Sequence, residues 1–339
     1  MKKAIPLFLI LILLSGCWDS KEIEEIGFVM GVGLDPAEGD AFETTFQIAI
    51  PSQLVQQSSP ANKGKPPFIN VSSVGKSNFK NIRQIGARRS RTLNFEHLQV
   101  IVIHTELLEL GILEHILDVY LRDHEMRRRT LILASEDPVK ELLKNQLPLE
   151  SFKAKSIEKI QENYQRVLSM PKLTSIGDIS RYIPKETGYI IPLISKFESD
   201  EVIIEGGAII NGSDKLVGLL NPLETEGYNR VIGETNQSVT EVKADDEVFV
   251  YESYLMNSYI SFEHTNDENT FHITIKTEGA IGESWLNQKK LSENKFLFKL
   301  QTLIEQKIEK EINGIVKVMQ EEYYTDVFGF GDIIKSENS

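Results

Sequence analysis

The sequence contains a single cysteine, Cys17, among its 339 residues. One cysteine cannot form an internal disulfide bond, so packing and hydrogen bonds must hold the fold. Long apolar runs are missing as well. The N-terminal run, residues 5–14, has about half of the ~20 apolar residues that a membrane-spanning helix needs. The sequence therefore predicts neither a disulfide-rich module nor an integral membrane protein.

Basic residues are scarce relative to acidic ones. Lys and Arg number 37 and Asp and Glu number 50, which gives a formal net charge of −13. Such a surface repels phosphate groups, so we expect no nucleic-acid partner and no attraction of anionic headgroups to the protein surface. The hydrophobic content of 41% and the charged content of 26% are typical of a globular protein. The length fits two or three domains.

Residue patterns of common enzymes are also absent from the sequence. The six histidines have no metal-ligand spacing, and neither a G-x-S-x-G elbow nor a calcium-loop spacing occurs. Residues 70–77 imitate the end of a phosphate-binding loop, but Asn70 replaces its first glycine. Gly31-Val32-Gly33 lacks the third glycine of a dinucleotide fingerprint and predicts close backbone packing in a strand instead. We expect no catalytic residue, no metal, no cofactor and no enzymatic activity, and we favour a binding or assembly role.

The N-terminus carries a secretory signal. Lys2 and Lys3 precede the apolar run, which ends in Leu14-Ser15-Gly16-Cys17 and resembles the lipobox of bacterial lipoproteins. We expect residues 1–16 to be removed as a signal peptide. Cys17 would then become an N-palmitoyl, S-diacylglycerol cysteine whose acyl chains hold the protein on the outer face of a membrane. The alternatives are an uncleaved signal anchor and a buried, inert cysteine.

Apolar periodicity predicts a strand-rich beginning followed by an alternating middle. Strands at 26–34 and 42–50 would form a hairpin, and residues 51–67 have the composition of a loop or linker. Strands and helices then alternate from about residue 68, which predicts a small sheet covered by helices. The expected strands are 69–74, 99–104 and 130–134, and the expected helices are 78–88, 111–120, 139–144, 151–168 and 175–182.

Strands dominate again from residue 189. We expect them at 189–197, 202–210, 216–219, 247–250, 255–263 and 270–281. A helix at 221–229 begins with Asn221-Pro222, and residues 266–269 form a hairpin turn. The last helix, 293–321, has apolar residues three or four positions apart, which predicts packing on a neighbouring sheet rather than a coiled coil. They are Leu297, Leu300, Ile304, Ile308, Ile312, Ile315 and Met319.

Four stretches of the chain together resemble the Ger(x)C family, the lipoprotein C-subunits of nutrient germinant receptors in endospore-forming bacteria. The resemblance extends from Cys17 to about residue 333. The stretches are Cys17-Trp18-Asp19 with the acidic residues that follow, residues 28–35 (F-V-M-G-V-G-L-D), residues 91–103 and residues 121–127 (L-R-D-H-E-M-R). Residues 326–331 (D-V-F-G-F-G) resemble a further family motif.

The resemblance implies an α+β, three-domain mixed α/β lipoprotein with antiparallel and mixed sheets and a long C-terminal helix packed on a sheet. Residues 17–55 and 186–225 would form a discontinuous N-terminal domain. Residues 66–185 would form an inserted middle α/β domain, and residues 230–339 a C-terminal α+β domain. One departure concerns the end of the chain: family members continue past the 326–331 motif, so we expect the last sheet here to be short or to have an open edge.

The resemblance also implies a function. The protein would serve germination in response to nutrients by assembling with A and B membrane subunits, on the outer face of the cell membrane or the spore inner membrane. Direct nutrient binding is left open. Expected partner contacts are Trp18, Asp19, Glu22, Arg122, Asp123 and Arg127. Two alternatives remain: a free-standing solute-binding lipoprotein with a concave site, and an envelope hydrolase with two carboxyl groups roughly 5 to 10 Å apart in a groove.

Overall fold

The computed structural model describes most of the chain beyond the N-terminal segment. The described residues are 25–55, 66–123, 126–144, 150–198, 201–235, 237–245, 247–266, 268–284 and 290–337. Cys17, Trp18, Asp19 and Glu22 lie outside these residues, so the signal peptide, the lipid site and the N-terminal partner contacts stay predictions.

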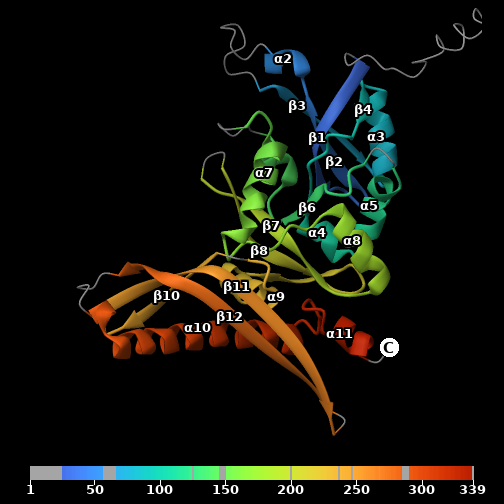
Figure 1. Ribbon diagram of the computed structural model, residues 1–339. Coiled ribbons are helices and arrows are strands. Elements are labelled where there is room, and N and C mark those ends of the chain that lie inside the picture. Colours follow the sequence, from blue (N-terminus) through green and yellow to red (C-terminus); the bar gives the residue numbers. More distant parts are fainter. Residues whose placement is uncertain are drawn as a thin grey trace, which may run out of the picture.

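The first two thirds of the chain form one nine-stranded sheet (Figure 1). Its strand order is β3-β2-β1-β5-β6-β7-β8-β9, with β4 paired to β1 beside this path. The central pairs from β1 through β5 and β6 to β7 are parallel, whereas the outer pairs are antiparallel. The strands are β1 (Ile26–Pro36), β2 (Phe42–Ala49), β3 (Phe68–Gly75), β4 (Thr92–Asn94), β5 (Val100–His104), β6 (Leu131–Ser135), β7 (Tyr189–Lys196), β8 (Val202–Ile210) and β9 (Leu216–Leu220).

Helices cover both faces of this sheet, because its central strands are apolar on both sides. In β5, Ile101 and Ile103 belong to one core cluster, whereas Val100 and Val102 belong to another. The first cluster includes α3 (Asn78–Gly86), α4 (Thr105–Glu109), α5 (Leu113–Arg122) and α8 (Ile176–Tyr182). The second includes α6 (Val139–Leu142) and α7 (Lys153–Gln161). Short helical segments complete this part: α2 (Pro51–Val55), η3 (Glu162–Gln165) and η4 (Ile183–Lys185).

The Gly-Val-Gly stretch of β1 makes room for the helices above it, as predicted. A Cβ atom at Gly31 would lie 2.8 Å from Ala154 Cβ, and one at Gly33 would lie 2.7 Å from Val139 Cγ1. The next acidic residue, Asp35, accepts hydrogen bonds from the first two backbone amides of α6, Val139 N (2.6 Å) and Lys140 N (2.8 Å). Burial nevertheless raises the pKa of Asp35 above its usual value.

The domain boundaries stay a prediction, but the strand pairing shows how the expected N-terminal and middle domains are connected. Strands β5 and β6, from the segment expected to be an inserted domain, lie between β1 and β7 of the expected N-terminal domain. One continuous ladder of backbone hydrogen bonds therefore joins the two segments.

The last third of the chain forms a separate three-stranded antiparallel sheet with a long helix along it (Figure 1). Its strands are β10 (Ser238–Ala244), β11 (Glu247–Thr265) and β12 (Glu268–Ser284), and its helices are α9 (Pro222–Ile232), α10 (Asn294–Glu321) and α11 (Phe330–Glu337), with the short η5 (Lys290–Ser292) before α10. The predicted start of α9 is confirmed, because the Asn221 side chain caps it. The fold class and the packing of α10 on a sheet are confirmed as well.

Several predicted elements need correction. The apolar stripe of α10 begins at Phe296, whereas Leu297 is 41% exposed. The strands expected at 247–250 and 255–263 are one strand, β11, because two register shifts keep it paired to β12. The helix expected at 151–168 is shorter, since α7 ends at Gln161 and η3 follows. Strand β10 was not predicted because its buried positions are small or polar: Ser238, Thr240, Val242 and Ala244. Helices α4 and α11 were also missed.

Helix α9 joins the two sheets through consecutive side chains. Asn229 donates hydrogen bonds to Leu168 O (2.7 Å) and Met170 O (2.8 Å) beside the first sheet. Arg230, whose side chain is only 1% exposed, bonds to Glu311 Oε2 of α10 (2.9 Å) and to Thr240 Oγ1 of β10 (2.9 Å). A buried guanidinium is tolerated only when it is paired, so this contact fixes where α10 and β10 lie relative to α9.

We predict that Arg230→Met lowers the free energy of unfolding by about 3–5 kcal/mol, because it leaves the largely buried carboxylate of Glu311 with only a long contact to Lys307 (3.9 Å). The double variant Arg230→Met/Glu311→Leu should recover much of this loss, since both charges are then removed. Urea denaturation measures both effects. The control is Lys317→Met, which breaks a fully exposed pair with Glu321 (3.7 Å). An equal loss in Arg230→Met and Lys317→Met would contradict the assigned role.

Candidate functional site

The L-R-D-x-E-x-R motif lies at the end of α5, where it borders a hollow of about 260 Å³. Arg122 and Asp123 both line this hollow, so the structure brings these two predicted contact residues together. Arg122 Nε donates to Asp118 Oδ1 one helical turn earlier (2.6 Å). Asp123 ends the helix, with its backbone amide donating to Val119 O. His124 and Glu125 lie outside the described residues.

The rest of the motif divides between the hollow and the open surface. Arg127 is exposed and does not line the hollow, whereas the neighbouring Arg128 does. Tyr120 forms the inner wall, and its buried hydroxyl has no hydrogen-bond partner among the described residues. Burial raises the pKa of Tyr120 far above its usual value, so the phenol stays neutral. Tyr120 could not be identified from the sequence, because its spacing is that of an ordinary core residue of an amphipathic helix.

The D-V-F-G-F-G motif after α10 forms a tight turn around one carboxylate. Asp326 Oδ1 accepts from the backbone amides of residues 328, 329 and 330 at 3.1, 2.9 and 3.2 Å, and Oδ2 accepts from that of Gly331 at 2.7 Å. Both carboxylate oxygens of Asp326 are therefore satisfied within the protein. The Asp326 carboxylate therefore holds the backbone of this turn in place and is not available as a catalytic acid or base.

This turn closes the seam between the two sheets. The ring of Phe328 lies 5.9 Å from that of Tyr228 on α9 and 5.3 Å from that of Phe330, which in turn stacks on Phe271 of β12 at 4.5 Å. At the same seam Lys185 pairs with Asp332 of α11 (2.7 Å). The segment after α10 thus returns to the first sheet and contacts both parts of the molecule.

A polar hollow of about 520 Å³ lies at this seam, where a solute-binding protein would be expected to hold its ligand. Most of its charged side chains are already engaged: Lys185 pairs with Asp332, and Asp326 holds the four amides of its turn, whereas Glu186 is exposed. Lys335 also has a partner within the protein. The hollow therefore offers few free charged groups to a solute.

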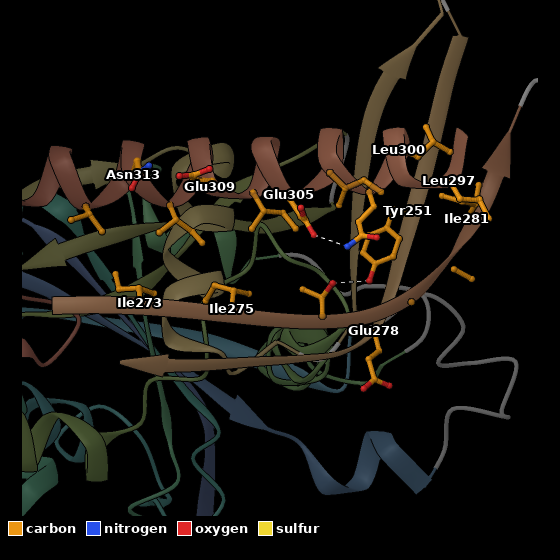
Figure 2. A pocket seen from close by; sticks show the side chains of 18 of the residues that line it. Tyr251, Ile273, Ile275, Glu278, Ile281, Leu297, Leu300, Glu305, Glu309 and Asn313 are labelled. Carbon is orange, nitrogen blue, oxygen red and sulfur yellow. Dashed lines mark hydrogen bonds between the residues drawn. The ribbon is translucent and has the colours of Figure 1, made fainter. Parts of the chain in front are cut away.

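A groove of about 1090 Å³ lies between β12 and α10 (Figure 2). Isoleucines of the strand and the helix face each other across it. Its glutamates do not form a facing pair: Glu305 and Glu309 lie one turn apart on the exposed side of α10, and Glu278 points away from the helix (Figure 2). Glycoside hydrolysis requires two carboxyl groups on opposite sides of the scissile bond.

The described residues contain neither a cluster of metal-binding side chains nor a membrane-spanning helix. Within the described ranges, no group of three or more His, Cys, Asp or Glu side chains could hold a metal ion. The histidines have separate local contacts; for example, His104 accepts from Glu106 N at the start of α4. None of the helices in the described part of the chain is long and apolar enough to cross a bilayer.

Comparison with known proteins defines the class as spore germination proteins. A model of the spore germination protein N-terminal domain matches residues 19–196, and a model of the spore germination B3/GerAC-like C-terminal region matches residues 205–339. The chain therefore belongs to the Ger(x)C family, as its motifs predicted.

Individual relatives agree with this assignment. Spore germination protein B3 of Bacillus subtilis (strain 168) is 27% identical over 338 residues, which cover 98% of this chain and 88% of that protein. Spore germination protein A3 of the same organism is 26% identical over 286 residues, covering 84% and 74% of the two chains. The crystal structure of the GerBC protein shares the fold with a TM-score of 0.60 and 22% identity, over 93% of this chain and 90% of that one.

We predict that Asp326→Ala destabilises the seam by about 1–3 kcal/mol, because the backbone amides of its turn lose their common acceptor. Hydrogen exchange at residues 328–331 should accelerate. Asp332→Ala is the control, since it removes only a partly exposed ion pair, worth up to about 1 kcal/mol. Unchanged exchange at residues 328–331 in Asp326→Ala would show that the turn does not depend on this carboxylate.

Proposed function

We propose that the chain is the lipid-anchored subunit of a nutrient germinant receptor. It is exported, cut before Cys17 and held by lipid on the outer face of the cell membrane or the spore inner membrane. It acts by assembling with the A and B membrane subunits, and its action is needed for germination in response to nutrients.

The observation that carries this proposal is the position of the lone cysteine relative to the family match. Cys17 stands directly after an apolar run and small residues, and the matched N-terminal region begins at residue 19. Anchoring by two or more acyl chains gives stable membrane attachment to a protein without an apolar span. An acidic surface would not hold the protein at anionic headgroups by itself.

An assembly role fits the described surfaces better than the two alternatives do. Most charged groups of the seam hollow are engaged by the protein itself. The glutamates of the large groove lie along one helix side or point away, so they do not converge on a substrate. No observation favours the solute-binding or the hydrolase alternative over subunit assembly.

We further propose that Arg122 and Asp123, at the hollow after α5, contact a membrane subunit. Both belong to a motif that resembles the family pattern and lie together at one surface site. The Arg122 side chain is exposed, so it can exchange its contact with Asp118 for one with a partner at little cost.

We predict that Cys17→Ala yields a folded protein that leaves the membrane, because the thiol that accepts the diacylglyceryl group is gone. Spores carrying it should germinate poorly with nutrients, in a strain without a redundant receptor. Membrane fractionation and loss of spore optical density measure the two effects. Normal germination with the protein still in the membrane fraction would overturn the proposed anchor, because the membrane subunits would then hold the chain without lipid.

We predict that Arg122→Glu slows nutrient germination severalfold at normal protein level, since it reverses a charge at the proposed contact. Arg129→Glu is the matched control, because Arg129 is exposed nearby but does not line the hollow. Immunoblotting of spore membranes measures the protein level of each variant. Equal germination rates in the two variants would count against a contact at this site.

A further inference from the structure

The groove between β12 and α10 combines an apolar helix face with the free edge of a strand. One wall is an apolar helix face, with Leu300, Ile304 and Ile308 directed into the groove. The other wall is β12, an edge strand that pairs only with β11 among the described residues. Its half-buried Ile273 and Ile275 face the helix (Figure 2).

The unpaired edge determines what kind of molecule fits. A row of backbone N–H and C=O groups along β12 can accept another strand, and such edges are otherwise blocked or covered in stable proteins. A fatty acyl chain would fill the apolar space but leave these groups without partners. An added strand would satisfy them and also place alternate side chains against α10. We infer that the groove binds an extended peptide segment of a partner by strand addition to β12.

The dimensions and charge of the groove define this segment further. The helix wall from Leu297 to Val316 is about 28 Å long at 1.5 Å per residue, which matches a strand of about eight residues. The lining contains Glu278, Glu305 and Glu309 and no basic residue. In the bound segment, every second side chain is therefore apolar and points toward α10, and lysine or arginine residues lie near these glutamates.

The same charge argues against two other occupants. Residues 17–24 of this chain include three acidic residues and would be repelled by the glutamates of the groove. A second copy of the chain, with a net charge of −13, would bring its own β12 and Glu278 against the first. A basic partner segment is the occupant that the charges favour.

This inference does not rest on the proposed receptor assembly, because it can be tested with the full-length chain in detergent and a synthetic peptide. The probe is a capped, fluorescent Lys-Ile-Lys-Val-Thr-Ile-Lys-Val-Lys peptide. One control peptide has glutamate in place of each lysine, and a second has proline in place of the central threonine, which removes a backbone donor. Fluorescence anisotropy measures binding, and hydrogen exchange measures protection of β12.

We predict that the lysine peptide binds and slows exchange along residues 271–281, whereas both control peptides bind weakly or not at all. Leu297→Asp should weaken binding about tenfold, because it places a charge in the apolar wall. Its matched control is Phe298→Asp, since Phe298 is 69% exposed and does not line the groove. Circular dichroism confirms that each variant is folded.

A second pair of variants tests the charge without touching the apolar wall. Glu309→Lys should weaken binding about threefold to fivefold, and Glu321→Lys, an equal charge change farther along α10, should not. Equal binding of the proline or glutamate peptide, or unchanged exchange in β12, would overturn strand addition by a basic segment. Sedimentation that shows a dimer lost in Leu297→Asp would assign the groove to a second copy and also overturn it.

Discussion

The arrangement of the molecule depends on one buried charge, the guanidinium of Arg230. Removing such a group from water is costly unless a carboxylate and further acceptors meet it, and Glu311 and Thr240 do so here. These partners come from α10 and β10, so the position of the whole second sheet follows from the position of α9. Buried ion pairs contribute little net stability, but they strongly favour one geometry over others.

Helix α9 also contacts the first part of the chain, through hydrogen bonds from a neutral side chain. Asn229, the neighbour of Arg230, binds the carbonyl oxygens of Leu168 and Met170. The turn around Asp326 closes the opposite side, where Phe328 meets Tyr228. These polar contacts act together with apolar packing, because Ile190, Ile209 and Leu220 of the first sheet share a core cluster with α9 and α10. Helix α5, which borders the hollow, and helix α10, which borders the groove, therefore belong to one framework (Figure 1).

Local signals in the sequence predicted the elements that depend on local physics. The continuous apolar runs of β5 and β6, the capped start of α9 and the stripe of α10 were all identified in this way. Strand β10 was missed because its buried face holds the polar residues Ser238 and Thr240. Their hydroxyl groups form hydrogen bonds inside the protein, Ser238 with Ser253 on the neighbouring strand and Thr240 with Arg230. The stripe was misplaced by one residue at its start, where Phe296 rather than Leu297 turns inward to meet Phe249.

The candidate site was predictable only in part. The motif at 121–127 pointed to Arg122 and Asp123, which do lie together, but sequence spacing could not tell that Arg128 rather than Arg127 shares their hollow. Asp326 was recognised as part of a motif, whereas its four backbone contacts depend on the path of the turn. Arg230 and Glu311 are 81 residues apart, and no local pattern links them.

The central claim is that this Ger(x)C-family chain works as an anchored subunit of a larger membrane complex. The most direct test is affinity purification of the native lipoprotein from spore inner membranes in mild detergent, with identification of co-purifying proteins by mass spectrometry. The account predicts that integral membrane A and B subunits co-purify in constant ratio and that Cys17 carries lipid. Recovery of the chain alone, from the soluble fraction and with an unmodified Cys17, would contradict it.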